Sequence, residues 1–302
     1  MYDVIIIGGG PGGITAALYA IRSNLKTLLL EGQFLGGNAS YADMIENFPG
    51  FPDGVKGFDL TQKMELQVSN MGVEIKYGEV TKIDFDAMRV FTDHEEFETK
   101  TIILAMGLKH KELGIPSEEH FKGKGVVYCT VCDGPLYANR STVVAGVGLP
   151  GITSALFLDK IAKSVVLVTP AKDIKSKETI YIDRLGKSNV EVITNSKVID
   201  LKGNERLEKV IIEDNATGER RELDAEGLFV NIGKVPNTAF LEGTGIELNK
   251  GGFIKVNDKQ MTSINGVYAV GDVTSEPYKQ ISTAVGDGCK AALNISKLLG
   301  AR

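Results

Sequence analysis

The chain alternates between short apolar runs and stretches in which apolar residues recur at helical spacing. Val4 to Ile7 is a β-branched apolar run, which is typical of a strand buried on both faces. Residues 14–21 carry apolar side chains at helical spacing, and Thr27 to Leu30 form a second apolar run that ends at Glu31. The order strand, helix, strand predicts a parallel β-α-β unit over the first 31 residues.

The same pattern recurs further along the chain. The glycine-rich turn at residues 8–13 is repeated, with the same glycine spacing, at residues 146–151. Apolar runs at 143–145 and 165–168 repeat the two strands on either side of it. Two such units in one register predict an α/β protein with two Rossmann-like domains of the dinucleotide-binding type, each a three-layer ββα arrangement.

The rest of the pattern indicates how these domains are connected. We expect short strands over residues 73–105, a hairpin over 207–223, a buried strand over 266–272 and a long amphipathic helix over 280–299. Proline-bearing stretches at 113–116 and 233–237 bracket the second unit. The second domain is therefore expected to be inserted in the first, with residues 1–113 and 238–302 forming the outer, discontinuous domain and residues 114–237 the inserted one.

Composition narrows the class of protein. With 302 residues the chain is long enough for two domains of about 150 residues each. A formal net charge of −5 argues against a nucleic-acid or anionic-membrane surface, and no apolar run approaches the roughly 18 residues that span a bilayer. The N-terminus lacks the basic region of a signal peptide, and three cysteines suit a reducing compartment, so we expect a cytoplasmic location.

The first glycine-rich turn is the strongest binding signal. Gly8 allows a tight turn, Gly10 lets the backbone approach a pyrophosphate, and Gly13 lets helix and strand pack closely. Glu31, at the end of the following strand, can accept hydrogen bonds from the hydroxyls of an adenosine ribose. A ligand-free tight turn is the alternative, but the full context of strand, helix and acidic residue favours a bound dinucleotide.

Three segments together resemble a known family. The turn at residues 8–13 with Glu31, the stretch Glu-Asn-Phe-Pro-Gly-Phe-Pro at 46–52 and Ala-Val-Gly-Asp at 269–272 look like the FAD-binding segments of low-molecular-weight thioredoxin reductases. The resemblance covers nearly the whole chain and implies FAD as cofactor and a homodimer. It also implies that residues 1–113 and 238–302 form the FAD-binding domain and residues 114–237 an NAD(P)H-like domain. It implies that Asp272 holds the flavin side of FAD, that Gln280 and Ile281 lie beside the isoalloxazine ring, and that Asn47 lies near its other edge.

The same resemblance implies further FAD-binding residues. These are small or amide-bearing residues next to the strands, namely Pro11, Gly12, Gly37, Asn38, Ala105, Gly107 and Gly271. Taken without the resemblance, Gly271 and Asp272 would be better explained as a strand-ending turn with a helix cap.

Cys129-Thr130-Val131-Cys132 is the candidate redox centre. This spacing places two sulfurs within reach of a disulfide across one turn. A metal site would need further ligands, and only Cys289 and three scattered histidines (His94, His110 and His120) remain, none at ligand spacing, so no metal is expected. Cys289 is expected to be an inert core thiol and the histidines solvated surface residues.

The resemblance implies a role for each residue of this centre. Cys132 would face the flavin, Cys129 would attack the disulfide of a partner protein, and Asp133 would be the general acid that protonates the departing thiolate. The alternative for Asp133 is a helix-capping carboxylate. The family commonly has Ala-Thr between the cysteines, whereas this chain has Thr130 and Val131.

The second unit departs from the family at the place where NADPH would bind. Thr169 stands where Glu31 stands in the first unit, and the His-Arg-Arg run that the family uses for the 2′-phosphate is absent. An NADPH enzyme using Lys172 and Lys175 is the alternative. Leu149 and Pro150 also add bulk to the loop that would approach the pyrophosphate.

Members of the family without the basic run resemble the ferredoxin-dependent flavin thioredoxin reductases. We therefore expect a flavin-dependent thioredoxin reductase, with thioredoxin as acceptor and reduced ferredoxin as donor, and Lys109, Lys111, Lys122 and Lys124 as a candidate basic patch for it. The alternatives are an NADPH-dependent thioredoxin reductase, a small-molecule dithiol oxidase of the same fold and a non-enzymatic flavin- or metal-binding sensor.

Overall fold

The structure, a computed structural model, describes residues 1–42, 44–174 and 179–301. It divides into two compact units, one formed by Met1–Lys109 with Val235–Arg302 and the other by His110–Lys234. The chain passes between the units after residues 109 and 234, whereas the sequence pattern placed these crossings after residues 113 and 237. At the crossings, β7 (Leu108–His110) and β16 (Lys234–Pro236) pair with each other.

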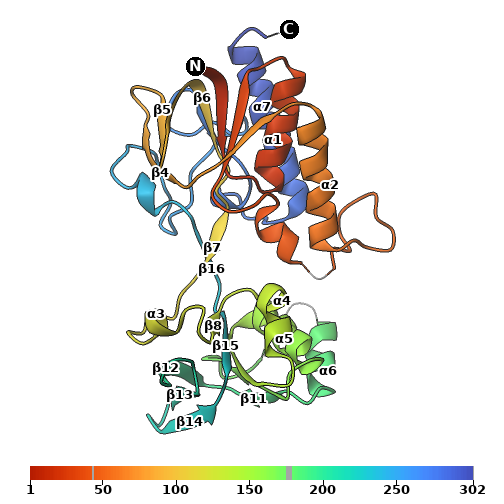
Figure 1. The fold of residues 1–302 in the computed structure, drawn as a ribbon, viewed down its shortest axis with the longest axis vertical. Coiled ribbons are helices and arrows are strands. Elements are labelled where there is room, and N and C mark those ends of the chain that lie inside the picture. Colours follow the sequence, from red (N-terminus) through yellow and green to blue (C-terminus); the bar gives the residue numbers. More distant parts are fainter. Residues whose placement is uncertain (43, 175–178, 302) are drawn as a thin grey trace. The chain divides into compact units, whose positions relative to one another are not determined.

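A parallel sheet forms the centre of the first unit. In it β1 (Tyr2–Ile7) pairs with β2 (Thr27–Glu31) on one side and β6 (Glu96–Leu104) on the other. The sheet continues with β3 (Glu74–Tyr77) beside β2 and β17 (Val267–Ala269) beside β6. Helices α1 (Pro11–Arg22), α2 (Gly57–Asn70) and α7 (Ile281–Leu298) lie together on one face of this sheet (Figure 1).

One long strand joins this parallel sheet to an antiparallel one. Residues 99–104 of β6 pair with β1, whereas residues 96–98 pair with β5 (Arg89–Thr92), which in turn pairs with β4 (Val80–Asp84). The first unit therefore has a helical layer, a parallel sheet and an antiparallel sheet. Short 3-10 turns complete it, η1 (Gly37–Tyr41), η3 (Ala239–Leu241) and η4 (Gly271–Val273).

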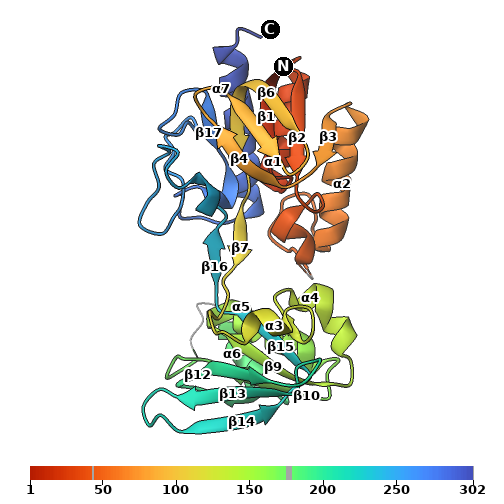
Figure 2. The ribbon, with the colours of Figure 1, turned by 60° about the vertical axis from the view of Figure 1, so that its left-hand side comes forward.

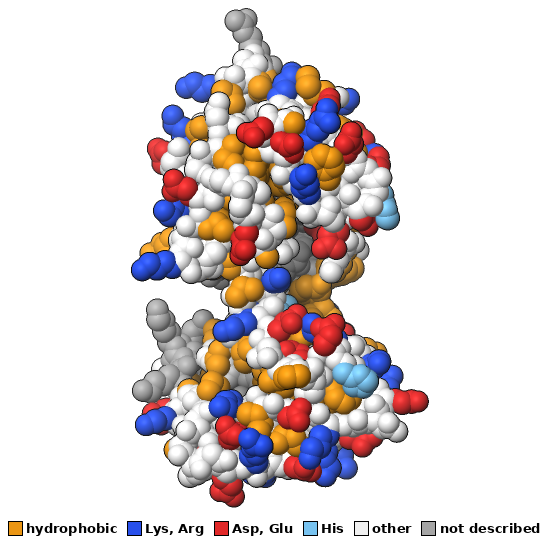
Figure 3. Space-filling model, turned by 90° about the vertical axis from the view of Figure 1, so that its left-hand side faces the viewer, with side chains coloured by type: hydrophobic (Ala, Val, Ile, Leu, Met, Phe, Trp, Pro, Cys, Tyr) orange, Lys and Arg blue, Asp and Glu red, His pale blue; other side chains and the backbone are white. Residues whose placement is uncertain are grey.

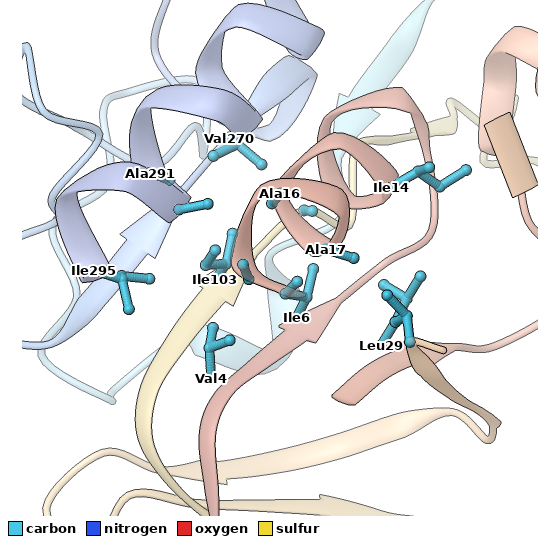
Figure 4. Packing of buried hydrophobic residues seen from close by; sticks show 14 of the residues in the cluster. Val4, Ile6, Ile14, Ala16, Ala17, Leu29, Ile103, Val270, Ala291 and Ile295 are labelled. Carbon is cyan, nitrogen blue, oxygen red and sulfur yellow. The ribbon is translucent and has the colours of Figure 1, made fainter. Parts of the chain in front are cut away.

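The strand pattern explains the two cores of this unit. Val4, Ile6 and Ile103 face the helices, and the small side chains of Ala16 and Ala17 let α1 lie close to them (Figure 4). The intervening strand residues, such as Ile5 and Ile7, point into a second core on the opposite face. Because residues 4–7 of β1 are buried on both faces, this part of the strand is continuously apolar rather than alternating.

The second unit repeats the architecture. Its parallel sheet has the order β11-β10-β9-β15-β8, and an antiparallel meander packs beside it (Figure 2). The parallel strands are β8 (Val126–Val127), β9 (Ser141–Gly146), β10 (Ser164–Val168), β11 (Glu191–Ile193) and β15 (Gly227–Asn231). The meander is β12 (Ser196–Lys202), β13 (Lys209–Asp214) and β14 (Arg220–Asp224). The helices are α3 (Glu118–Phe121), α4 (Thr130–Asp133), α5 (Gly148–Asp159) and α6 (Thr179–Gly186), with η2 (Gly134–Tyr137) after α4.

These observations confirm the predicted fold class, an α/β protein with two Rossmann-like three-layer units, one inserted in the other. The expected hairpin is β13–β14, and the expected closing helix is α7. Within the described ranges, no helix is both long and apolar enough to cross a membrane.

Candidate functional site

In the first glycine turn, two glycines are packed too closely to carry a side chain, and a third has free space beside it. A Cβ on Gly8 would lie 2.4 Å from the Ala105 carbonyl oxygen, and one on Gly13 would lie 1.9 Å from the Gly8 oxygen. A Cβ on Gly10 would meet no described atom within 4 Å. Gly10 is the N-cap residue of α1, whose N-terminus has no side-chain cap in the described part of the chain. Free space beside uncapped helical N–H groups suits a phosphate.

Glu31 lies directly beside this turn. Its Oε2 accepts a hydrogen bond of 2.7 Å from the Gly9 N–H, and its Oε1 accepts one of 3.0 Å from the Gln33 N–H. The side chain is only partly exposed, at the carboxyl end of β2. A carboxylate held beside this glycine turn suits an interaction with the hydroxyls of an adenosine ribose.

The neighbouring predicted residues line the same end of the sheet. Gly37 adopts a φ of +52° in η1, and a Cβ there would lie 3.3 Å from the Gly10 Cα. The Asn38 amide donates a hydrogen bond of 2.7 Å to the Leu108 carbonyl oxygen. Ala105, which is buried, follows β6 and borders the glycine turn, and Gly107 follows it with a φ of +59°.

Gly271 and Asp272 lie in η4, immediately after β17. Gly271 has a φ of +70°, and its N–H donates a hydrogen bond of 3.2 Å to Oδ2 of Asp287 on α7. Oδ1 of Asp287 accepts a hydrogen bond of 2.9 Å from Gln260. Burial raises the pKa of Asp287. Asp287 therefore supports the turn that carries Asp272, a role that sequence reasoning missed although an acidic residue between two helical glycines was visible.

Asn47 and Gln280 contact each other directly. The Asn47 amide donates a hydrogen bond of 3.1 Å to Gln280 Oε1, whereas the resemblance places the two residues near different edges of one flavin ring. Gln280 caps α7 through a reciprocal capping box with Thr283. Ile281, the first residue of α7, packs against the small apolar cluster around Ile45.

Taken together, this end of the first unit fits a dinucleotide such as FAD. The glycine turn, the uncapped N-terminus of α1 and Glu31 would hold the pyrophosphate and the adenosine ribose. Gly271 and Asp272 lie at the end of another parallel strand of the same sheet, and ligands of open α/β sheets bind at the carboxyl ends of such strands.

The two predicted redox cysteines form a disulfide in the second unit. The S–S distance between Cys129 and Cys132 is 2.12 Å, and their Cα atoms are 5.4 Å apart. Cys129 is the N-cap of α4, and its sulfur accepts a hydrogen bond of 3.2 Å from the Cys132 N–H. Cys132 is exposed and Cys129 is partly exposed. A donor N–H aimed at the Cys129 sulfur favours its thiolate once the disulfide opens.

Asp133 belongs to the same helical turn. Its N–H donates to the Cys129 carbonyl oxygen at 3.1 Å, so its backbone is fixed relative to the disulfide. Burial raises the pKa of the Asp133 carboxyl. A raised pKa lets the carboxyl keep its proton at higher pH, which suits a residue that protonates a thiolate.

The structure also reveals a buried carboxylate next to this centre. Glu118 is 2% exposed and accepts hydrogen bonds from the N–H groups of Leu113 and Gly114 at 2.9 and 2.8 Å. It accepts a third bond, of 2.8 Å, from the hydroxyl of Tyr128, the residue before Cys129. Glu118 stands in a charged run in the sequence, and nothing in that run indicates that one carboxylate is buried.

The second glycine turn borders a hollow of about 170 Å³. It is lined by Gly146, Gly148, Ile152, Leu167, Thr169, Ala171, Asp173 and Ile174. The charged side chain among these lining residues is the carboxylate of Asp173. Thr169 is buried at the end of β10, and Lys172 is exposed and does not line the hollow. Lys175 lies outside the described residues.

Two expectations about surrounding residues were wrong. His110 is half-buried rather than solvated, and burial together with the nearby Lys234 lowers its pKa to about 4. Cys289 is partly exposed rather than a core thiol, and its hydrogen bond with the Tyr19 hydroxyl raises the pKa of Tyr19. His94 and His120 are exposed as expected. The part of the chain that the structure describes holds no cluster of three or more His, Cys, Asp or Glu residues that could bind a metal.

Comparison with known proteins assigns this combination of sites to a family. The model of the pyridine nucleotide-disulphide oxidoreductase family matches residues 2–288. A thioredoxin reductase of Treponema pallidum is 35% identical over 96% of this chain and 95% of its own length. The crystal structure of Lactococcus lactis thioredoxin reductase has a TM-score of 0.91 at 38% identity and covers 99% of both chains.

A ferredoxin-flavin thioredoxin reductase from Clostridium acetobutylicum is also similar, with a TM-score of 0.55 at 30% identity over 100% of this chain and 99% of that chain. These matches agree with the dinucleotide site of the first unit and the disulfide of the second. The chain belongs to the low-molecular-weight thioredoxin reductases, FAD-dependent disulfide oxidoreductases within the pyridine nucleotide-disulphide oxidoreductase family.

Proposed function

We propose that this protein reduces thioredoxin by passing electrons from FAD through the Cys129–Cys132 pair. The observation that carries the proposal is the redox turn itself, a disulfide between an exposed and a partly exposed cysteine, followed directly by the half-buried Asp133, whose carboxyl pKa is raised. When bound and reduced by the donor, FAD would supply the two electrons that open the disulfide. The chain's own residues then carry out the exchange with the acceptor.

In that exchange the Cys129 thiolate attacks one sulfur of the thioredoxin disulfide, and a mixed disulfide forms as the other sulfur leaves. Asp133 donates a proton to the departing thiolate. The Cys132 thiolate then attacks Cys129, which releases reduced thioredoxin and restores the Cys129–Cys132 disulfide. The N–H of Cys132, which donates to the Cys129 sulfur, stabilises the attacking thiolate in the first step.

We further propose that the electron donor is reduced ferredoxin rather than NADPH. The hollow beside the second glycine turn supports this, because the described residues that line it include the carboxylate of Asp173 and no cationic side chain for a 2′-phosphate. The direction of electron flow is favourable. A ferredoxin near about −400 mV lies roughly 130 mV below thioredoxin at about −270 mV, which corresponds to about 6 kcal/mol for two electrons.

The basic patch considered for ferredoxin is weakened by ion pairs. Lys122 pairs with Glu112 at 2.9 Å and also with Glu119. On the face seen in Figure 3, basic and acidic side chains are interspersed rather than segregated. Lys109 in the first unit and Lys111 and Lys124 in the second remain exposed, and we keep the two lysines of the second unit as the candidate contact.

The donor is tested by anaerobic titration of the FAD-loaded protein. Reduced ferredoxin should bleach the flavin absorption band and then support reduction of thioredoxin, whereas NADPH at the same concentration should leave the band unchanged. Rapid bleaching by NADPH would overturn the ferredoxin proposal and identify an NADPH-dependent thioredoxin reductase.

A gain-of-function variant provides the control. Thr169→His combined with Pro170→Arg and Ala171→Arg builds the missing basic run at the end of β10 and should make NADPH a more effective reductant. Cys129→Ser should abolish thioredoxin reduction with either donor. Continued turnover by Cys129→Ser would refute the proposed exchange at this pair.

A further inference from the structure

The helical turn that carries the disulfide is too short to hold its own position. Helix α4 spans four residues, and a single helical turn in isolation is unstable. Val131 is partly exposed and Cys132 is exposed, whereas Thr130 is 7% exposed. The anchor of the turn must therefore be sought at Thr130.

The Thr130 hydroxyl is bound from two sides. It donates a hydrogen bond of 2.9 Å to the hydroxyl of Ser154 on α5, which is itself 7% exposed. It accepts a hydrogen bond of 3.2 Å from the side-chain amide of Asn231, the last residue of β15. The backbone carbonyl oxygen of Asn231 in turn accepts a hydrogen bond of 3.1 Å from the backbone N–H of Val147, in the second glycine turn. Thr130 thus connects the redox turn to a helix and to a strand end of the same unit.

We propose that Thr130 is a positioning residue that sets the reduction potential of the Cys129–Cys132 pair. Reduction breaks the S–S bond, adds two electrons and two protons and gives two thiols. The sulfurs then separate from bonding to non-bonded distance, and a shift of the turn backbone would share this movement with rotation of the cysteine side chains. Because the hydrogen bonds of Thr130 are formed with the disulfide closed, they favour the closed geometry and oppose that adjustment.

Removing the hydroxyl should therefore make the disulfide easier to reduce. Thr130→Val keeps the shape of the side chain but leaves Ser154 and Asn231 without their partner. We expect the equilibrium constant between the pair and a dithiol reference to shift about tenfold toward the reduced form, which is about 30 mV for a two-electron couple. Thr130→Ser keeps the hydroxyl and should stay close to the wild type.

The experiment equilibrates the FAD-loaded protein in buffers of reduced and oxidised dithiothreitol. Free thiols at Cys129 and Cys132 are trapped with a maleimide and counted by peptide mass spectrometry. Thr142→Val is the matched control, because Thr142 is 1% exposed and donates a hydrogen bond of 3.0 Å to the Ser164 carbonyl oxygen in the same unit, away from the redox turn. Loss of that bond should leave the equilibrium unchanged.

Two results would overturn the inference. One is an equilibrium constant of Thr130→Val within twofold of the wild type, and the other is a Thr130→Ser variant shifted as far as Thr130→Val. If Thr130→Val does not fold, Ser154→Ala removes the Thr130–Ser154 hydrogen bond by deleting its acceptor. Ser154→Ala must then shift the equilibrium toward the reduced form, or the inference fails. The inference rests on dithiol exchange at this pair, but its readout needs neither ferredoxin nor thioredoxin, so it fails independently of the proposed donor and acceptor.

Discussion

Replacing Glu118 should loosen the segment that leads into the second unit. In the structure its carboxylate accepts two backbone N–H groups, from Leu113 and Gly114, and the hydroxyl of Tyr128. Glu118→Gln keeps the size of the side chain but replaces one acceptor oxygen by an NH₂ group. That group must face either the Gly114 N–H or both the Leu113 N–H and the Tyr128 hydroxyl, so at least one backbone donor loses its partner.

The cost follows from the burial of these groups. A hydrogen bond to a charged group contributes about 1.5–3 kcal/mol, and an unpaired buried donor costs about 1–3 kcal/mol. Leu113 and Tyr128 are half-buried and Gly114 is exposed, so water can replace part of what is lost. We therefore expect Glu118→Gln to lower the local free energy of opening by about 1–2 kcal/mol.

Amide hydrogen exchange read by mass spectrometry measures this local effect. A loss of about 1.4 kcal/mol corresponds to roughly tenfold faster exchange in a peptide covering residues 110–116. Glu119→Gln is the matched control, because Glu119 is the neighbouring residue but is exposed and forms only a surface ion pair with Lys122, worth about 0–1 kcal/mol. Equal exchange in the two variants would refute the reasoning, because it would mean that the buried carboxylate holds the segment no better than an exposed one.

Three further predictions concern cofactor binding and pH. Gly10→Ala should leave the thermal unfolding midpoint of the FAD-free protein nearly unchanged but weaken FAD retention. Gly13→Ala should lower both the unfolding midpoint and FAD retention, because its Cβ would lie 1.9 Å from a carbonyl oxygen. Thermal unfolding and flavin absorbance measure the two effects. Asp133→Asn should slow thioredoxin reduction about 100-fold. Burial raises the folded-state pKa of Asp133 above 3.8, so the wild type should lose stability relative to Asp133→Asn as the pH rises from 3.8 through the raised pKa. A pH-independent difference in unfolding midpoint between the two proteins would contradict this prediction. Because the pKa of His110 falls from 6.5 to about 4 on folding, wild type should lose stability relative to His110→Phe as pH falls from 6.5 toward 4, and parallel pH profiles would rule this out.

The fold could be predicted because its strands are buried on both faces. Val4 and Ile6 face the helices while Ile5 and Ile7 face the opposite core, so the whole run is apolar and stands out from its surroundings. The redox pair could be predicted for a similar reason, since a Cys-x-x-Cys spacing has few structural uses.

The supporting polar residues could not be predicted in this way. Glu118 and Asp287 are acidic, and a hydrophobicity pattern assigns acidic residues to the surface. Their burial depends on partners far along the chain or on backbone N–H groups, such as those of Leu113, Gly114 and Gly271, which carry no side-chain signal. Thr130 was noticed only as a departure from a family pattern, and its hydroxyl network became visible once Ser154 and Asn231 were placed beside it.

The two glycine turns explain why a glycine motif alone is weak evidence for a nucleotide. In the second unit, a Cβ on Gly146 would lie 2.6 Å from the Gly151 Cα, so both glycines are needed for the strand and helix to pack, with or without a ligand. Gly148, where a Cβ would meet no described atom within 4 Å, is the position that a ligand would need. A unit that stopped binding nucleotide would therefore keep two of its glycines to preserve the scaffold. That scaffold also carries the residues that anchor the redox turn, so the second unit can retain its glycine motif because the position of the disulfide depends on it. Whether this unit binds a nucleotide, and which one, is therefore indicated by Thr169 at the end of β10 rather than by the glycines.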